Sequence, residues 1–422
     1  MKDIETHQLK NGTYVHYISA DRFKNVNFTV NITVPIKRPD VTFNTLIPAV
    51  LRQGSAKFPV TKDLNIYLDD LYGANISYGI KKRGNYQVIV INFNTISDRY
   101  APNSKPFDKL LKLAAEILFN PLVKDNAFDN EYVNREKENL RQYIESVIND
   151  KREYAKIKLI NEMFSKEDYG IFSNGYVEEL DQITPENLYS YYKKLITEGL
   201  WEIFVTGPVN VEECNNFINS YFNFEKNVFN YSPADFGKYS NEIRKIEEAA
   251  DVTQGKLSIG MRTNVTINSP LYFAMIVMNN LYGGSVHSKL FLNVREKMSL
   301  AYYAGSAYDA HKGFILINSG IEFSNYEIAL KEILKQLDDV KSGIFTEQDI
   351  KFSKLSIINA YNSVKDSAVA MENFYSSQTL TKTFLTIEEI IDRINKVTKG
   401  DIIKAANTVI PDTVFFLKGR DV

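Results

Sequence analysis

Arg295 and Tyr302 are the two residues of this chain whose types and spacing best fit peptide chemistry. They begin and end the segment Arg295-Glu-Lys-Met-Ser-Leu-Ala-Tyr302. The guanidinium of an arginine can grip a peptide carbonyl, and a tyrosine hydroxyl can donate to the oxyanion that forms during hydrolysis. The alternative is structural: Arg295 in a surface pair with a glutamate, and Tyr302 buried in a strand. Tyr303 is the weaker candidate, because alternation along a strand sends it to the opposite face.

Metal chemistry has little support in the sequence. The four histidines are His7, His16, His287 and His311, and no two of them are three to five residues apart. We expect His287 and His311 to be surface or packed residues rather than ligands. Three glutamates of a long helical segment, Glu131, Glu136 and Glu138, would by themselves form a solvated face paired with Lys and Arg. One carboxylate does not make a zinc site.

Other reaction classes are also unsupported. The single cysteine, Cys214, lies in Glu-Glu-Cys-Asn-Asn with no histidine nearby, and no nucleophile elbow surrounds a serine. Neither a phosphate-binding loop nor a dinucleotide fingerprint is found.

Composition narrows the class of protein further. With 422 residues the chain is long for one hydrophobic core, so two or more domains are expected. The formal net charge is -2 and no basic stretch stands out, which argues against a nucleic-acid or membrane partner. One cysteine fits a reducing compartment, and the first residues lack an apolar signal core. We therefore expect a cytoplasmic protein.

Three pairs of segments recur in the same order, one copy in each half of the chain. Their offsets run from about 210 to 230 residues. They are Leu51–Ser55 with Leu281–Ser285, Phe107–Val147 with Tyr326–Val364, and Val177–Gly207 with Ile387–Gly419. Two similar tandem domains are the simplest explanation.

Each half contains both strand and helix patterns. Apolar residues alternate with polar ones from Val26 to Val34, which indicates a strand with one buried face, and Tyr86–Phe93 is typical of a central strand. Helical spacing follows, and Thr184-Pro185 predicts the start of a helix. Strands grouped before helices point to α+β domains. We predict domains at residues 1–223 and 254–422, joined by a charged linker at 224–253.

Taken together, these segments resemble the pitrilysin and processing-peptidase family of zinc peptidases. The resemblance covers nearly the whole chain and is most specific from Gly283-Gly284-Ser285 to Tyr302. It implies that Arg295 and Tyr302 contact substrate. It also implies two homologous domains, each a sheet packed with helices, that form a clamshell around a cavity.

The family's zinc motif, His-x-x-Glu-His, is missing. Counting back from Gly54-Ser55 places Thr45, Pro48 and Ala49 at the positions of the first ligand, the general base and the second ligand. Threonine is a poor neutral zinc ligand, and proline and alanine offer no donor or base. The chain is therefore predicted to bind no metal and to have no catalytic residue of its own.

The resemblance leads to two hypotheses. In the first, the chain is the non-catalytic, substrate-binding subunit of a metallopeptidase and pairs with a zinc-bearing homologue that processes peptides or small proteins; a homodimer is conceivable in isolation. In the second, it is a scaffold or peptide-binding protein without a proteolytic role. Gly283 and Gly284 fit either a close approach to substrate or a plain turn.

Overall fold

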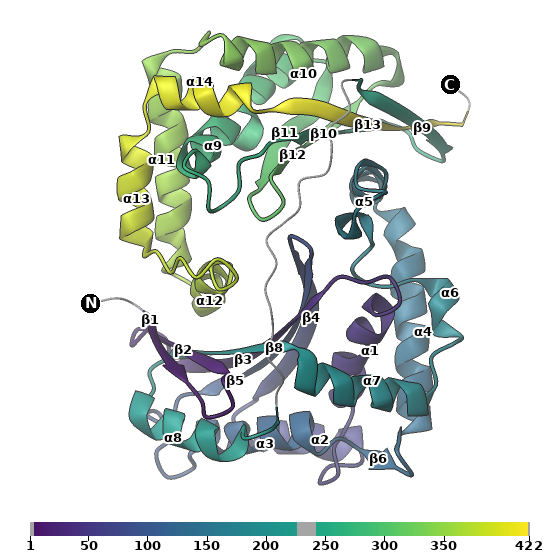
Figure 1. Ribbon diagram of the computed structural model, residues 1–422, viewed down its shortest axis with the longest axis vertical. Coiled ribbons are helices and arrows are strands. Elements are labelled where there is room, and N and C mark those ends of the chain that lie inside the picture. Colours follow the sequence, from purple (N-terminus) through teal and green to yellow (C-terminus); the bar gives the residue numbers. More distant parts are fainter. Residues whose placement is uncertain (1–3, 226–241, 421–422) are drawn as a thin grey trace. The chain divides into compact units, whose positions relative to one another are not determined.

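The computed structural model describes residues 4–225 and 242–420, which divide into two compact units. Within the described residues, the first unit contains 4–145, 172–225 and 364–384, and the second contains 146–171, 242–363 and 385–420. Each unit is built around one sheet with helices packed on it (Figure 1). The α+β class and the two-domain organisation expected from the sequence are confirmed.

The sheet of the first unit has six described strands in the order β1-β2-β8-β3-β5-β4. Its strands are β1 (Ile4–Gln8), β2 (Tyr14–Ser19), β3 (Asn25–Pro35), β4 (Asn75–Arg83), β5 (Tyr86–Ile96) and β8 (Leu200–Gly207), and a short hairpin is formed by β6 (Val123–Lys124) and β7 (Ala127–Phe128). Its helices are α1 (Val41–Leu51), α2 (Thr61–Asp70), α3 (Pro106–Phe119), α4 (Asn130–Ser146), α6 (Val177–Leu180), α7 (Pro185–Glu198), α8 (Val211–Tyr221) and α12 (Ala368–Ser376).

The second unit has five described strands in the order β11-β12-β10-β13-β9. They are β9 (Arg244–Ala250), β10 (Gly255–Arg262), β11 (Ala301–Asp309), β12 (Phe314–Ile321) and β13 (Ile410–Gly419). The helices are α5 (Lys151–Met163), α9 (Tyr272–Asn279), α10 (Tyr326–Lys341), α11 (Glu347–Val364), α13 (Ile387–Lys396) and α14 (Lys399–Asn407). Shorter helical turns are η1 (Val147–Asn149), η2 (Asp168–Gly170), η3 (Asn280–Gly284), η4 (Leu290–Lys297) and η5 (Phe323–Asn325).

Five strands of the first sheet, all except β1, recur with the same topology in the second. In the first unit β3 pairs antiparallel with β5 and β8, β4 pairs antiparallel with β5, and β2 runs parallel to β8. In the second unit β10, β12, β13, β11 and β9 repeat these pairings in the same order, including the single parallel pair. The recurrence found in the sequence is therefore a structural duplication.

Alternation correctly predicted strand β3, but the expectation that only one of its faces is buried is wrong. Phe28, Val30 and Ile32 belong to the core beneath α1, α3 and α7. Thr29 and Asn31 point to the other face, yet both are buried. Helix α12 contributes to this burial, since its Glu372 accepts a 2.7 Å hydrogen bond from Thr29.

The units exchange one helix each. Helix α5 comes from the first half of the sequence but packs in the second unit, where Leu159 and Met163 meet strands β12 and β13. Helix α12 occupies the corresponding place in the second repeat but packs in the first unit, with Met371 and Tyr375 against Ile18. Sequence patterns did not indicate this exchange, because an apolar helix face does not identify the sheet that it covers.

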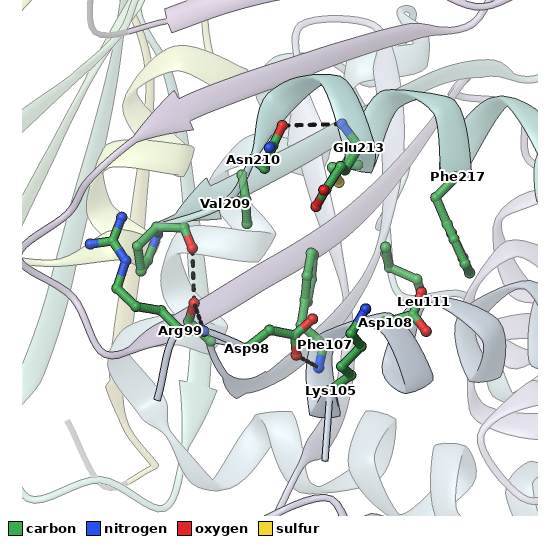
Figure 2. A pocket seen from close by; sticks show the side chains of 13 residues that line it. Asp98, Arg99, Lys105, Phe107, Asp108, Leu111, Val209, Asn210, Glu213 and Phe217 are labelled. Carbon is green, nitrogen blue, oxygen red and sulfur yellow. Dashed lines mark hydrogen bonds between the residues drawn. The ribbon is translucent and has the colours of Figure 1, made fainter. Parts of the chain in front are cut away.

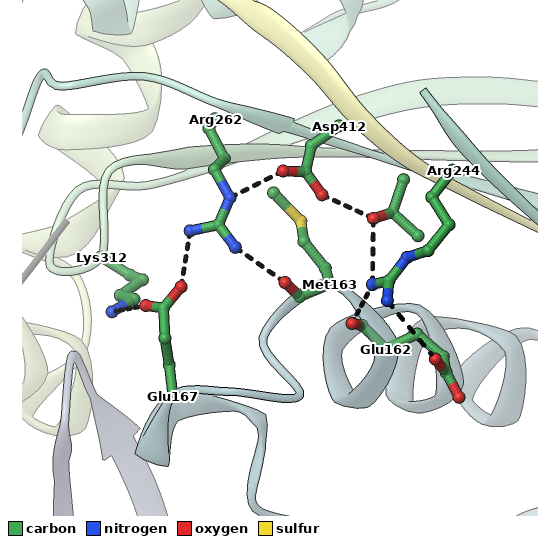
Figure 3. Close-up of polar contacts among 8 residues, drawn as sticks. Glu162, Met163, Glu167, Arg244, Arg262, Lys312 and Asp412 are labelled. Atoms are coloured by element: carbon green, nitrogen blue, oxygen red, sulfur yellow. Dashed lines mark hydrogen bonds and ion pairs between the residues drawn. The ribbon is translucent and has the colours of Figure 1, made fainter. Parts of the chain in front are cut away.

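A buried charge network holds α5 in the second unit (Figure 3). Arg262 donates to Asp412 at 2.8 Å and to Glu167 at 2.7 Å, and Lys312 pairs with Glu167 at 2.6 Å. The side chains of Arg262 and Lys312 are 9% and 2% exposed. Charges this deeply buried stabilise a fold only when they are fully paired.

The predicted linker differs from the structure at its C-terminal end. Residues 226–241 lie outside the described part of the chain, but Arg244–Ala250 forms β9 and pairs with β13. The charged residues of this segment suggested a linker, but β9 is an edge strand whose exposed side chains are mostly charged. None of the helices within the described ranges is long and apolar enough to span a membrane.

Candidate functional site

Helix α1 presents the positions at which the family resemblance predicts a zinc motif. The Thr45 hydroxyl donates a 2.9 Å hydrogen bond to the Val41 carbonyl of the same helix. Pro48 lies inside the helix, and both Pro48 and Ala49 are buried among apolar neighbours. These three side chains supply neither ligands nor a base, so zinc does not fit this site.

The glutamates of α4 also lack the arrangement of a metal site. Glu136 is buried, which corrects its assignment to a solvated face, and its two carboxylate oxygens accept from Gln53 at 2.8 Å and from Asn139 at 3.1 Å. Glu138 pairs with Arg141 on the helix surface, and Glu131 is exposed. Across residues 4–225 and 242–420, no three His, Cys, Asp or Glu side chains are placed to hold a metal.

Arg295 lies on η4 with its side chain 41% exposed. Its guanidinium stands 4.5 Å from the centre of the Phe291 ring, and its nearest carboxylate is that of the adjacent Glu296, at 3.6 Å. The pairing with a glutamate that the sequence left open is therefore present. An exposed pair of this kind is weak, so it does not tie Arg295 to one position.

Tyr302 is presented to solvent by an irregularity in the edge strand β11. In the pairing with β12, Ala301 faces Ile321 and Tyr303 faces Gly320, so Tyr302 is an extra residue on the bulged strand. Bulges bend a strand and redirect a side chain. Tyr302 is accordingly 61% exposed, and the interpretation as a buried strand tyrosine is wrong.

The hydroxyl of Tyr302 donates to the carboxylate of Glu322. This hydrogen bond and the negative charge of Glu322 raise the pKa of the tyrosine. The hydroxyl is therefore held as a neutral donor. Tyr303 is half-buried, with the guanidinium of Arg152 4.7 Å from its ring centre, and it is not presented in the same way.

Gly283 and Gly284 lie in η3, a helical turn packed on β11. A Cβ at Gly283 would stand 2.6 Å from the Ser306 hydroxyl and 2.8 Å from the Ser306 nitrogen, so only glycine fits there. A Cβ at Gly284 would meet its nearest atoms, on Asn279, at 3.3 Å. Packing accounts for Gly283; contact of either glycine with substrate stays a prediction.

A cavity of about 300 Å³ that no sequence pattern indicated lies beside the edge strand β4. Ser77 and Lys81 of β4 line one side, Asn92 of β5 lies between, and Glu372 of α12 lines the other. Burial raises the pKa of Glu372 to about 7, against the opposing influence of its hydrogen bond from Thr29. No sequence signal could have found this group, because α12 is distant in the sequence from β4 and β5.

The chain is similar to several known proteins. Residues 182–356 match the family described as Peptidase M16 inactive domain. The chain is 36% identical over 411 residues to the probable inactive metalloprotease YmfF of Bacillus subtilis, covering 97% of this chain and 96% of that protein. It is 23% identical to the uncharacterized zinc protease YmxG of the same organism, covering 70% of this chain and 71% of that one. A conserved protein from Enterococcus faecalis has a crystal structure that superposes with a TM-score of 0.92 at 32% identity, covering 100% of this chain and 99% of that one.

Proposed function

Because this chain belongs to the peptidase M16 family and is an inactive, metalloprotease-like member of it, we propose that it is the non-catalytic, substrate-binding subunit of a two-chain zinc peptidase. The partner is a homologous chain that carries an intact His-x-x-Glu-His motif and the zinc. Together the two chains process peptides or small proteins. The proposed location is the cytoplasm of a bacterium, which the single cysteine and the bacterial relatives support.

One contrast within the chain carries this proposal. At the three positions of the zinc motif, helix α1 offers only the Thr45 hydroxyl, a poor zinc ligand that already donates to Val41, whereas Tyr302 and Arg295 are 61% and 41% exposed. Tyr302 lies on a strand bulge, and its hydroxyl is kept protonated by Glu322. Hydrolysis at zinc also needs groups that hold the carbonyl while negative charge develops on it. Arg295 and Tyr302 fit that part of the reaction.

Two further observations support the proposal. Bacillus subtilis has two relatives of this chain. One is named a probable inactive metalloprotease and the other an uncharacterized zinc protease. In addition, β4 lies at an edge of its sheet beside a cavity, and an extended peptide can add to such an edge through main-chain hydrogen bonds. Enclosure of the peptide between the two units stays a prediction.

The second candidate function is that of a scaffold or peptide-binding protein without a peptidase partner. In isolation such a chain could form a homodimer. The observation in its favour is that Arg295 and Tyr302 each have a carboxylate neighbour of their own, Glu296 and Glu322. Those contacts alone would give both residues a structural role.

Reconstitution separates the two candidates. The zinc-bearing homologue from the same genome is expressed alone, and this chain is titrated into it while cleavage of a quenched peptide library is followed. We expect activity well above that of either chain alone, saturating at one chain per homologue. Full activity from the homologue by itself, with no change on addition, would contradict the two-chain proposal and favour the scaffold.

A further inference from the structure

The first unit contains a second, larger cavity of about 570 Å³ between α3 and α8 (Figure 2). The loop after β5 closes one end of it, and the loop after β8 forms part of the wall. Helix α8 follows β8 in the first unit, and within the described residues no helix follows the matching strand β13. The cavity is therefore described in only one of the two copies of the fold.

The floor of the cavity is apolar. Phe107 and Leu111 of α3 and Cys214 of α8 are buried, and Phe217 lies half-buried at one side. Burial raises the pKa of the Cys214 thiol to about 12, so this residue is part of the floor and not a nucleophile. A ligand with an apolar side chain would remove these rings and methyl groups from water.

The helix ends at this cavity are already capped. Asp98 accepts a 2.7 Å hydrogen bond from the Phe107 amide at the start of α3, and Asn210 accepts one of 3.2 Å from the Glu213 amide at the start of α8. Each cap satisfies one N-terminal amide of its helix. The side chains of the lining add charged groups that can recognise a ligand.

Two charged side chains of the lining are available for a ligand. Within the described residues, the Lys105 ammonium and the Glu213 carboxylate form no hydrogen bond or ion pair. Burial raises the pKa of Asp98, and the positive charge of Lys105 partly opposes this shift. The other rim charges are engaged: Arg99 pairs with Asp21 and Asp108 with Lys112, each at 3.0 Å.

These two groups approach the cavity from opposite helices. In Figure 2 the Glu213 carboxylate points from α8 toward the ring of Phe107, while Lys105 lies at the start of α3 on the other wall. A carboxylate, an ammonium and an apolar floor together match a molecule that carries the opposite charges and an apolar side chain. Charge-assisted hydrogen bonds at both ends would fix its orientation.

We propose that this cavity binds a small zwitterion with an apolar side chain, either a dipeptide with free ends or an amino acid. Its ammonium pairs with Glu213, its carboxylate with Lys105, and its side chain lies on Phe107 and Leu111. The volume is in the range of small-molecule sites. This site involves none of the residues proposed to assist hydrolysis.

Calorimetry with the isolated full-length chain tests the site without any peptidase partner. The probes are Leu-Phe, N-acetyl-Leu-Phe, Leu-Phe amide and free phenylalanine. We expect Leu-Phe to bind, and blocking either end to weaken binding about fivefold to tenfold, because each block removes one charge-assisted contact at a partly exposed site. Phenylalanine binding as tightly as Leu-Phe would identify the amino acid as the occupant.

Two variants assign each end of the ligand. Glu213→Gln should remove the penalty of N-acetylation but keep that of amidation, and Lys105→Gln should do the reverse. Glu212→Gln and Lys109→Gln, exposed neighbours that do not line the cavity, are the matched controls and should behave like the unchanged chain. Absence of binding at millimolar Leu-Phe, or equal affinity for all the Leu-Phe probes, would overturn the proposal.

Discussion

The guanidinium of Arg262 donates a 2.7 Å hydrogen bond to the main-chain carbonyl of Met163, the last residue of α5. In the first unit Arg83 does the same for the other exchanged helix, donating to the carbonyl of Ser376 at the end of α12. A cation at a helix C-terminus satisfies a carbonyl that has no partner within the helix and interacts favourably with the helix dipole. Both exchanged helices are thus held at their C-terminal ends by a buried arginine.

Arg262→Met should destabilise the second unit. The substitution removes the donor to Met163 and leaves the Asp412 carboxylate buried without its charged partner. Breaking a buried network in this way costs about 3 kcal/mol. Urea unfolding measures the loss. Arg244→Met is the matched control. Arg244 also donates to a main-chain carbonyl of α5, that of Glu162, but its side chain is 45% exposed and its ion pair with the Glu162 carboxylate is 3.9 Å long, so a loss below about 1 kcal/mol is expected. Equal losses in both variants would contradict the importance of the buried network.

A side chain at Gly260 should force the side chain of Met163 on α5 to shift. A Cβ at this position of β10 would stand 2.3 Å from the sulfur of Met163. We expect Gly260→Ala to lower the free energy of unfolding by about 1–3 kcal/mol, through overpacking. Combining it with Met163→Ala should cost less than the sum of the two single changes. Additive losses in this double-mutant cycle would show that the helix does not pack there.

Docking of α12 should weaken as pH rises. Burial raises the pKa of Glu372 to about 7 from an ordinary value of 4.5, although Lys81 and Arg83 oppose the shift. Between these values the folded protein keeps the proton that the unfolded chain has lost, so stability falls with rising pH across the window. The whole effect is about 1–3 kcal/mol.

Hydrogen exchange of α12 at pH 5 and pH 8 measures this dependence. Glu372→Gln cannot ionise, so its α12 should show the smaller change between the two conditions. An identical pH response in the two proteins would show that another group is responsible.

Much of the fold could be predicted because it depends on local patterns. Alternation predicted β3, and Thr184-Pro185 correctly marked the start of α7, where Thr184 forms a capping box with Asn187. The recurring segments predicted two similar domains. This prediction is right, because the second sheet repeats strand pairings of the first.

The long-range features could not be predicted. Nothing in the amphipathic pattern of α5 shows that Met163 contacts Gly260 instead of the sheet of its own half. The bulge that exposes Tyr302 depends on the pairing register between β11 and β12. No motif in the sequence predicts that register. The cavity between Lys105 and Glu213 likewise joins residues that are distant in the sequence.

Zinc should be absent from the purified chain at stoichiometric amounts, because Thr45, Pro48 and Ala49 provide no ligands on α1. Elemental analysis after dialysis without chelator measures this directly. The zinc-bearing homologue, prepared in parallel, is the positive control. One tightly held zinc per chain, lost on substitution within residues 45–49, would contradict the assignment.

Tyr302→Phe and Arg295→Ala should lower the activity of the reconstituted peptidase without preventing assembly. Tyr302 is a donor on a bulged edge strand, and removing only its hydroxyl leaves the ring and the strand unchanged. Loss of one preorganised donor to a developing oxyanion costs about 10² in kcat. Arg295→Ala should act mainly on KM if the guanidinium binds the substrate in its ground state.

Tyr303→Phe is the matched control for these two variants. Its ring is half-buried beneath Arg152, so the substitution should leave the rate of peptide cleavage unchanged. Co-purification with the homologue shows whether assembly is intact. If a complex carrying both substitutions cleaves peptides at the full rate, Arg295 and Tyr302 have only a structural role, and the contacts with Glu296 and Glu322 account for them.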